Sequence, residues 1–290
     1  MAALPPGAAR DKGLALGAEV AAGMLARRAA DGRSTVMAPY QPSKDAGKYQ
    51  GATAVMMVGP LVRPFTLARA DQFRPGPPPA LTSAAYAKDF NETKAMGGSA
   101  STQRSEAQSQ VALFHTEAPG TTLTRNVGRL ARSTNNAADA ARLIAAVYAV
   151  NADAIIACFD AKYHYNAWRP YTAIALADSD GNPDTAPDPA WRSSQFTPPH
   201  PEYPAAHSCI AGGLATMLRS YYGTGEVAFM FDSKVTGTTH HYANVEALQH
   251  ESVEARIAGG IHFRFSAVAG DKLGSDVAAW AMQKHFQPRK

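Results

Sequence analysis

The sequence predicts an all-α fold, a bundle of helices preceded by an irregular, Pro-rich N-terminal wrap. Helical signals dominate from residue 82 onward, and the connections between them are mostly short. Strand signals are few, and the best candidate, residues 226–232, is short. The 290 residues are enough to bury one large core. We therefore expect one domain over 1–290, with a helix and extended wrap over 1–81 and a helical core over 82–290.

The elements follow from local signals. An Ala-rich amphipathic stretch at 13–28 predicts a first helix, which Asp31 and Gly32 end. Residues 32–81 are rich in Pro and Gly, which favours an extended segment over the core. An acidic, Pro-rich loop is expected over 178–191. The remaining predicted helices span residues 83–96, 102–115, 123–132, 137–168, 205–221, 244–259 and 267–286.

Composition excludes some classes of function. The formal net charge of +4 is spread along the chain, which does not suggest a nucleic acid or membrane surface as partner. The most apolar stretch, 141–159, is interrupted by Arg142, Asn151 and Asp153, so no membrane span is expected. No signal peptide is readable in the first residues. The compartment stays open, with a periplasmic or secreted location compatible.

Two cysteines, Cys158 and Cys209, exclude a disulfide-rich scaffold. A single bridge and two small buried thiols are both compatible with the sequence, and we favour the thiols.

Three segments carry candidate chemistry. In the first, Lys162 and Arg169 are seven residues apart on the predicted helix 137–168, close to two turns, so both should face one side. Two such cations repel each other unless an anion lies between them. Pro170 should stop or bend this helix. Two solvated surface cations are the alternative.

The second segment is the block from Thr197 to Ser208. Pro204 suits the first turn of a helix, which would leave the N–H groups of Ala205, Ala206 and His207 free at its positive end. Such an end binds anions, and His207 would place a proton donor beside one. The alternative is a plain helix start with an incidental histidine.

In the third segment, Arg256 and His262 are six apart, which would separate them on a continuous helix. Gly259 and Gly260 lie between them and should end or unwind the helix, so that His262 turns back toward Arg256. The glycines could instead mark close helix packing. Together, the three segments supply three cations, a helix N-terminus and two histidines, which suit a tetrahedral oxyanion such as vanadate or phosphate.

The order and spacing of these residues resemble the signature of the vanadium-dependent haloperoxidase and type 2 phosphatidic acid phosphatase superfamily. The resembling parts are Lys-x6-Arg-Pro, Pro-x-x-His and Arg-x5-His, and the segment 63–97 also looks like bacterial haloperoxidase homologues. The resemblance implies that Lys162, Arg169 and Arg256, with the amides of Ala205 and Ala206, bind the oxygens of vanadate, and that phosphate can occupy the same site.

The resemblance also implies roles for three histidines. His207 would be the acid–base residue, and His262 would bond directly to vanadium or attack phosphorus. His200 stands where bromoperoxidases carry His and chloroperoxidases carry Phe, which implies a halide-tuning role; a turn histidine without function is the alternative.

The sequence departs from the family at two places. Ala205 and Ala206 stand where Ser-Gly is usual, so a hydroxyl hydrogen bond to the anion is lost. Ser266 stands where an Asp, four residues after the final His, usually orients the ring of that histidine from a second layer. Both departures bear on turnover more than on anion binding.

We expect a vanadate-dependent haloperoxidase that uses hydrogen peroxide to oxidise bromide or iodide to hypohalous acid, with small organic acceptors. The GIHFRFS string, His200 and the long Pro-rich stretch favour this reading. A soluble acid phosphatase acting through a phosphohistidine is the first alternative. A non-catalytic oxyanion-binding homologue is the second. A homo-oligomer is compatible with the sequence.

Overall fold

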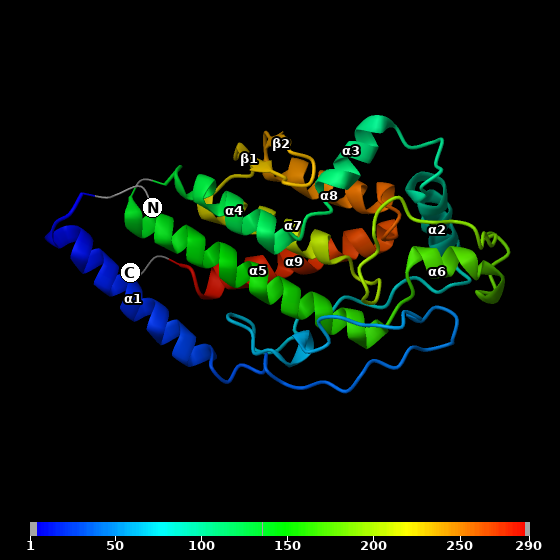
Figure 1. The fold of residues 1–290 in the computed structure, drawn as a ribbon, viewed down its shortest axis with the longest axis horizontal. Coiled ribbons are helices and arrows are strands. Elements are labelled where there is room, and N and C mark those ends of the chain that lie inside the picture. Colours follow the sequence, from blue (N-terminus) through cyan, green and yellow to red (C-terminus); the bar gives the residue numbers. More distant parts are fainter. Residues whose placement is uncertain (1–4, 135, 288–290) are drawn as a thin grey trace.

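The computed structural model describes residues 5–134 and 136–287, and these form a mainly helical fold, as predicted (Figure 1). The first methionine and its three neighbours, on which part of the signal-peptide argument depends, lie outside the described residues. The α-helices are α1 (Ala8–Arg28), α2 (Ala84–Gly97), α3 (Glu106–Phe114), α4 (Pro119–Ala131), α5 (Ala137–Tyr165), α6 (Pro170–Ala175), α7 (Ala206–Tyr222), α8 (Val245–Ala258) and α9 (Arg264–Lys284). Two short 3₁₀ helices are η1 (Gly59–Leu61) and η2 (Ala177–Ser179).

Polar side chains at the helix starts explain where several helices begin. Ser83 accepts a hydrogen bond from the N–H of Tyr86 at the start of α2, and Asn136 and Asn244 cap α5 and α8 in the same way. At α3, Ser105 and Gln108 form a reciprocal capping box. Each cap satisfies an N–H group that has no partner within its helix, which contributes about 1 kcal/mol.

Helices α5, α7 and α9 pack side by side as the centre of the bundle (Figure 1). α7 and α9 approach so closely that a Cβ on Gly274 would overlap the carbonyl oxygen of Cys209. α5 is the one helix among the described residues that is long and apolar enough to cross a membrane. Most of its apolar stretch is buried against the other helices. This is the burial expected of the core helix of a soluble protein.

A hairpin of two short strands, β1 (Phe229–Asp232) and β2 (Thr239–Tyr242), lies beside the bundle. The strands are antiparallel, with Phe229 opposite Tyr242 and Asp232 opposite Thr239. The expected strand at 226–232 is thus present over its last four residues. Its partner was not predicted, because the run Thr-His-His-Tyr carries little strand signal.

A buried carboxylate, that of Asp153, is one of the α5 groups that fix the extended wrap. Asp153 accepts hydrogen bonds from the N–H groups of Phe65 (2.6 Å) and Thr66 (2.7 Å), and from the Thr66 hydroxyl (2.6 Å). A further N–H, that of Leu67, lies 3.3 Å away. Asp153 is fully buried, so these donors replace the water that the carboxylate loses. The wrap is therefore ordered although it is mostly irregular, as expected, with η1 as a short helical turn within it.

A disulfide joins Cys158 of α5 to Cys209 of α7, across a Cα–Cα distance of 6.5 Å. The preference for two free thiols was therefore wrong. The two residues lie on helices far apart in sequence, and only the packing of α5 on α7 brings them within bonding reach.

Candidate functional site

Lys162 and Arg169 are both buried at the end of α5, but they do not share a helix. α5 ends at Tyr165, because Asn166 adopts a left-handed conformation with φ of 50°. Arg169 lies in extended backbone just before α6, and Pro170 opens that helix instead of bending the longer one. The predicted helix 137–168 was therefore too long, and helical spacing does not explain why the two cations meet.

The start of α7 is close to the prediction, with one correction. α7 begins at Ala206, with Ala205 as its N-cap, and Pro204 directly precedes the N-cap. The N–H of Ala205 is not free, because it donates to the carbonyl of Ser266 at 3.0 Å. Among the described residues, the N–H groups of Ala206 and His207 have no acceptor. The free amides of this helix end therefore begin one residue later than expected.

The turn between α8 and α9 forms as the two glycines predict. α8 ends at Ala258, and Gly260 has a φ of +70°, which favours glycine. A Cβ on Gly260 would also overlap the carbonyl oxygen of Gly97. Arg256 lies in the last turn of α8, and His262 follows the turn, two residues before α9 begins. Both side chains are buried.

Arg169 is the centre of the network that joins these segments. Its Nη1 lies 3.1 Å from Nε2 of His262 and donates to the carbonyl of Ile261 at 2.8 Å. On its other side, Nη2 lies 3.0 Å from Nδ1 of His200. Lys162 Nζ donates to the carbonyls of Pro201 and Glu202, both at 2.9 Å. The side chains of the first and third segments thus converge on the loop that precedes α7.

The positive charges of the cluster act on one another. Burial and the charge of Arg169 hold the pKa of Lys162 well below its ordinary value. Burial and the same neighbour lower the pKa of Arg256 to about 9. For His207 and His262, burial first, and then the nearby cations, lower the pKa well below the ordinary value. Both imidazoles are therefore neutral at pH 7.

Unpaired donors at the cluster fit an anion. Among the described residues, Arg256 makes one hydrogen bond, from Nη2 to the carbonyl of His115 at 2.7 Å, and its buried Nε has no partner. The buried Nε2 of His207 also has no partner among these residues, and in the neutral ring this nitrogen is a donor or an acceptor according to the tautomer. A buried donor without an acceptor is costly, and so is a buried guanidinium without a counter-charge. An oxyanion bound between these groups and the start of α7 would meet both needs.

Glu202 is a member of the cluster that the sequence did not predict. It is fully buried, and its Oε1 lies 2.8 Å from Nδ1 of His262. Burial raises the pKa of this carboxyl to about 7, against the opposing effect of Lys162 and Arg169. Ser266 does not reach the ring, and its Oγ donates instead to the backbone carbonyl of Glu202 at 3.3 Å. A signal was present: an acidic residue within an apolar, Pro-rich block next to the motif.

A small apolar cavity of about 50 Å³ adjoins the other side of His207. Its polar lining includes His115, Thr122 and Ser252. His115 is held by Glu251, whose Oε1 lies 2.8 Å from its Nε2. The remaining walls are mostly apolar and include Phe114, Leu123, Ile210, Leu214, Phe231 and Leu248.

Comparison with known proteins identifies relatives. The family profile described as the VCPO second helical-bundle domain matches residues 142–289, the part of the chain that holds the cluster. The vanadium chloroperoxidase of Curvularia inaequalis is 28% identical over 187 residues, which cover 48% of this chain and 30% of that protein. The chain thus matches less than a third of that relative.

Solved structures have the same fold. A bacterial vanadium-dependent iodoperoxidase is 26% identical and superposes with a TM-score of 0.71, over 88% of this chain and 65% of the other. The holo form of a bacterial vanadium-dependent chloroperoxidase superposes with a TM-score of 0.70, over 91% of this chain and 71% of the other. Because the chloroperoxidase is only 14% identical, its similarity shows a shared fold and nothing more.

Proposed function

Because this chain belongs to the vanadium haloperoxidase family, we propose that it is a vanadate-dependent haloperoxidase that oxidises bromide or iodide with hydrogen peroxide. The observation that carries the proposal is the buried cluster of Lys162, Arg169 and Arg256. Among the described residues none of these three side chains forms an ion pair, and the buried Glu202 carboxylate contacts His262 instead, so the cluster keeps a surplus of positive charge. An anion with two or three negative charges balances that surplus.

We assign the residues of the cluster by their free groups. Arg256, through its unpaired Nε, and the amides of Ala206 and His207 would hold the oxygens of vanadate. Lys162 and Arg169 would add positive charge, and His262 Nε2 would be the ligand to the metal. When bound, vanadate supplies a Lewis acid that activates hydrogen peroxide toward attack by halide.

His207 would move the proton. Its imidazole is neutral because burial and Arg256 lower its pKa, and Nε2 has no partner among the described residues. It can therefore take a proton from hydrogen peroxide at the site and return it to the oxygen that leaves. We assign halide tuning to His200, whose ring contacts Arg169 and packs edge-on against Phe159 at 5.1 Å. Hypohalous acid would then react with a small organic acceptor.

A soluble acid phosphatase is the second candidate, because the tautomer of His262 suits a nucleophile as well as a metal ligand. Arg169 Nη1 can only donate, so its contact with Nε2 of His262 leaves the proton on Nδ1. A neutral imidazole that is unprotonated at Nε2 can act as a nucleophile or as a metal ligand once the bound anion takes over the Arg169 N–H. In this reaction His262 would form a phosphohistidine, and His207 would protonate the leaving oxygen.

One set of assays separates the candidates. Purified protein is incubated with orthovanadate, and the oxidation of iodide and the bromination of a phenol dye are followed with hydrogen peroxide. Hydrolysis of p-nitrophenyl phosphate is measured on the vanadate-free protein. We expect vanadate-dependent halide oxidation that phosphate inhibits by competition. Phosphatase activity without halide oxidation would favour the acid phosphatase over the haloperoxidase. Tight anion binding without either turnover would identify a non-catalytic homologue, which the loss of Ser-Gly at Ala205 and Ala206 also permits.

A further inference from the structure

Glu202 contacts the candidate metal ligand His262 at Nδ1, the ring nitrogen opposite the one that faces Arg169. Its Oε1 lies 2.8 Å from Nδ1 of His262, and the same oxygen accepts the N–H of Phe263 at 3.0 Å. Because Oε1 of Glu202 accepts the N–H of Phe263, this oxygen is an acceptor and carries no proton. Nδ1–H of the ring is therefore the donor in the contact with Glu202.

The opposite edge of the ring leads to the same tautomer. Nε2 lies 3.1 Å from Arg169 Nη1, which has no lone pair to offer, so Nε2 must be unprotonated. The carboxylate and the guanidinium hold the imidazole from its two nitrogens. Nε2 thus presents a lone pair toward the cationic side of the cluster, as a metal ligand requires.

The backbone of Glu202 is held at both of its polar groups. Its N–H donates to the carbonyl of Ala167 at 2.9 Å, and its carbonyl accepts from Lys162 Nζ at 2.9 Å. The side chain is fully buried. A carboxylate on a backbone fixed in this way restrains the ring more than one on a mobile loop does.

We propose that Glu202 is the positioning residue of His262, and that it supplies from the loop before α7 the carboxylate that Ser266 lacks. The resemblance places an orienting Asp four residues after the histidine, in the first turn of α9. In this chain Ser266 occupies that position and only donates to the backbone of Glu202. The orienting group has moved to a different segment, sixty residues before the ring that it holds. The inference rests on the proposed function only for the role of His262 as the vanadium ligand. The contact between Glu202 and His262 does not depend on it.

A purely structural role for Glu202 is the competing explanation, since it also lies near Lys162 and Arg169 as a counter-charge. Returning the carboxylate to its usual position separates the two roles. Glu202→Ala removes the group, and Glu202→Ala with Ser266→Asp moves it to α9. If Glu202 acts only as a counter-charge for Lys162, the carboxylate added at position 266 should not compensate for its loss. If Glu202 positions His262, the added carboxylate gives the ring an acceptor again and should compensate.

The test uses the full chain and two measurements. The tautomer of His262 is determined by NMR of ¹⁵N-histidine-labelled protein without vanadate, with the resonance assigned through His262→Gln. Orthovanadate and inorganic phosphate affinities are measured by calorimetry. We expect a wild-type ring protonated at Nδ1. In Glu202→Ala the ring loses its acceptor at Nδ1 and can turn away from Arg169, so we expect a mixed tautomer and a dissociation constant about 10–100-fold higher, with the exchange variant restoring both. Asp178→Ala, which removes an exposed carboxylate of η2, is the control and should change neither.

Unchanged tautomer and affinity in Glu202→Ala would overturn the inference, and so would equal losses in the single and exchange variants. If Glu202→Ala does not fold by circular dichroism, Glu202→Gln keeps the volume. In that variant we expect the ring to stay protonated at Nδ1 and vanadate to bind more weakly. A vanadate affinity equal to that of the wild type would contradict the inference. If the wild type binds neither vanadate nor phosphate, the proposed function fails, while the NMR result still decides the role of Glu202.

Discussion

Arg256 is a guanidinium in the core whose Nε has no hydrogen-bond partner among the described residues. At the scale of single residues, such groups are the strongest indication of function, since folding alone would pair or remove them. His207, in the first turn of α7, likewise has a buried ring nitrogen, Nε2, without a partner among the described residues. Both residues belong to the motif that the sequence predicts, and both keep a free donor or acceptor at one cluster.

Replacing His207 tests its role in proton transfer. We expect His207→Ala to lower kcat for iodide oxidation by about 10²- to 10⁴-fold, the range for a lost acid–base group. Vanadate affinity should change little, because the assigned ligand His262 and the cations remain. His250→Ala, which removes a mostly exposed histidine of α8, is the control. A His207→Ala enzyme that keeps its turnover rate would contradict the assignment.

Replacing Ala205 by serine should strengthen the binding of orthovanadate. A serine here would restore the hydroxyl that the resemblance places at this position, next to the free amides of α7. One hydrogen bond to a charged oxygen is worth about 1.5 kcal/mol, so Ala205→Ser should tighten orthovanadate binding about tenfold. Calorimetric titration measures the change. Ala205→Gly, which adds no hydroxyl, should not tighten it, and an equal gain in both variants would refute the explanation.

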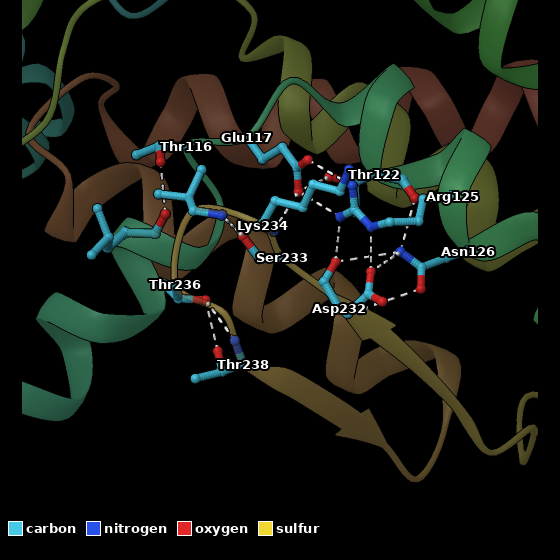
Figure 2. A network of polar contacts seen from close by, with 12 residues as sticks. Thr116, Glu117, Thr122, Arg125, Asn126, Asp232, Ser233, Lys234, Thr236 and Thr238 are labelled. Atoms are coloured by element: carbon cyan, nitrogen blue, oxygen red, sulfur yellow. Dashed lines mark hydrogen bonds and ion pairs between the residues drawn. The ribbon is translucent and has the colours of Figure 1, made fainter.

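At the scale of elements, a polar network fixes the hairpin to α4 (Figure 2). Arg125 of α4 forms ion pairs with Glu117 and with Asp232 at the end of β1. Arg129 adds a second pair to Asp232 at 2.6 Å, and Asn126 donates to the same carboxylate. The network therefore holds α4, and with it the cavity wall beside His207, against β1.

The network makes stability depend on pH. Hydrogen bonds from Arg125 lower the pKa of Asp232 to about 2, from an ordinary value of 3.8. The stabilisation is thus complete above pH 3.8 and is lost as the pH falls through about 2. We expect Asp232→Asn to lower the free energy of unfolding by about 1 kcal/mol at pH 7, since the pairs are partly exposed.

Urea unfolding at several pH values measures this difference. It should shrink as the pH approaches 2, when the wild-type carboxyl is itself protonated. Asp178→Asn, which changes an exposed carboxylate of η2, should have no effect. A penalty for Asp232→Asn that is constant down to pH 2 would show that charge is not its cause.

At the scale of the whole molecule, Asp153 is the buried anchor of the wrap around residues 65–67. Asp153→Asn replaces an acceptor of four hydrogen bonds by an amide that offers one oxygen, so N–H groups of the wrap lose their partner. We expect a loss of about 3 kcal/mol in the free energy of unfolding. Limited proteolysis should cut first between residues 32 and 81. Asp178→Asn serves again as the exposed control, and an unchanged cleavage pattern would show that the wrap is held elsewhere.

The sequence predicts the helices and most of the cluster because caps, prolines and glycines act locally. The glycines before His262 form their turn as expected, whereas Pro204 lies one residue before the N-cap of α7 and not in its first turn. The end of α5 was misplaced because the left-handed conformation of Asn166 depends on tertiary contacts, among them a hydrogen bond from the Tyr40 hydroxyl at 2.9 Å. Glu202 was missed for the same reason. Its partner lies sixty residues away, and local patterns do not report such distances.

The contact of α7 with α9 at Gly274 has a consequence for how this site can change. His207 is carried by the first turn of α7, and His262 lies two residues before α9 begins. The separation of the two imidazoles therefore depends on how closely the two backbones approach at this glycine. A single added methyl group there would push α7 and α9 apart and shift both histidines, although neither histidine would have been substituted. The spacing of the two imidazoles thus rests partly on a residue that is neither the acid–base group nor the ligand.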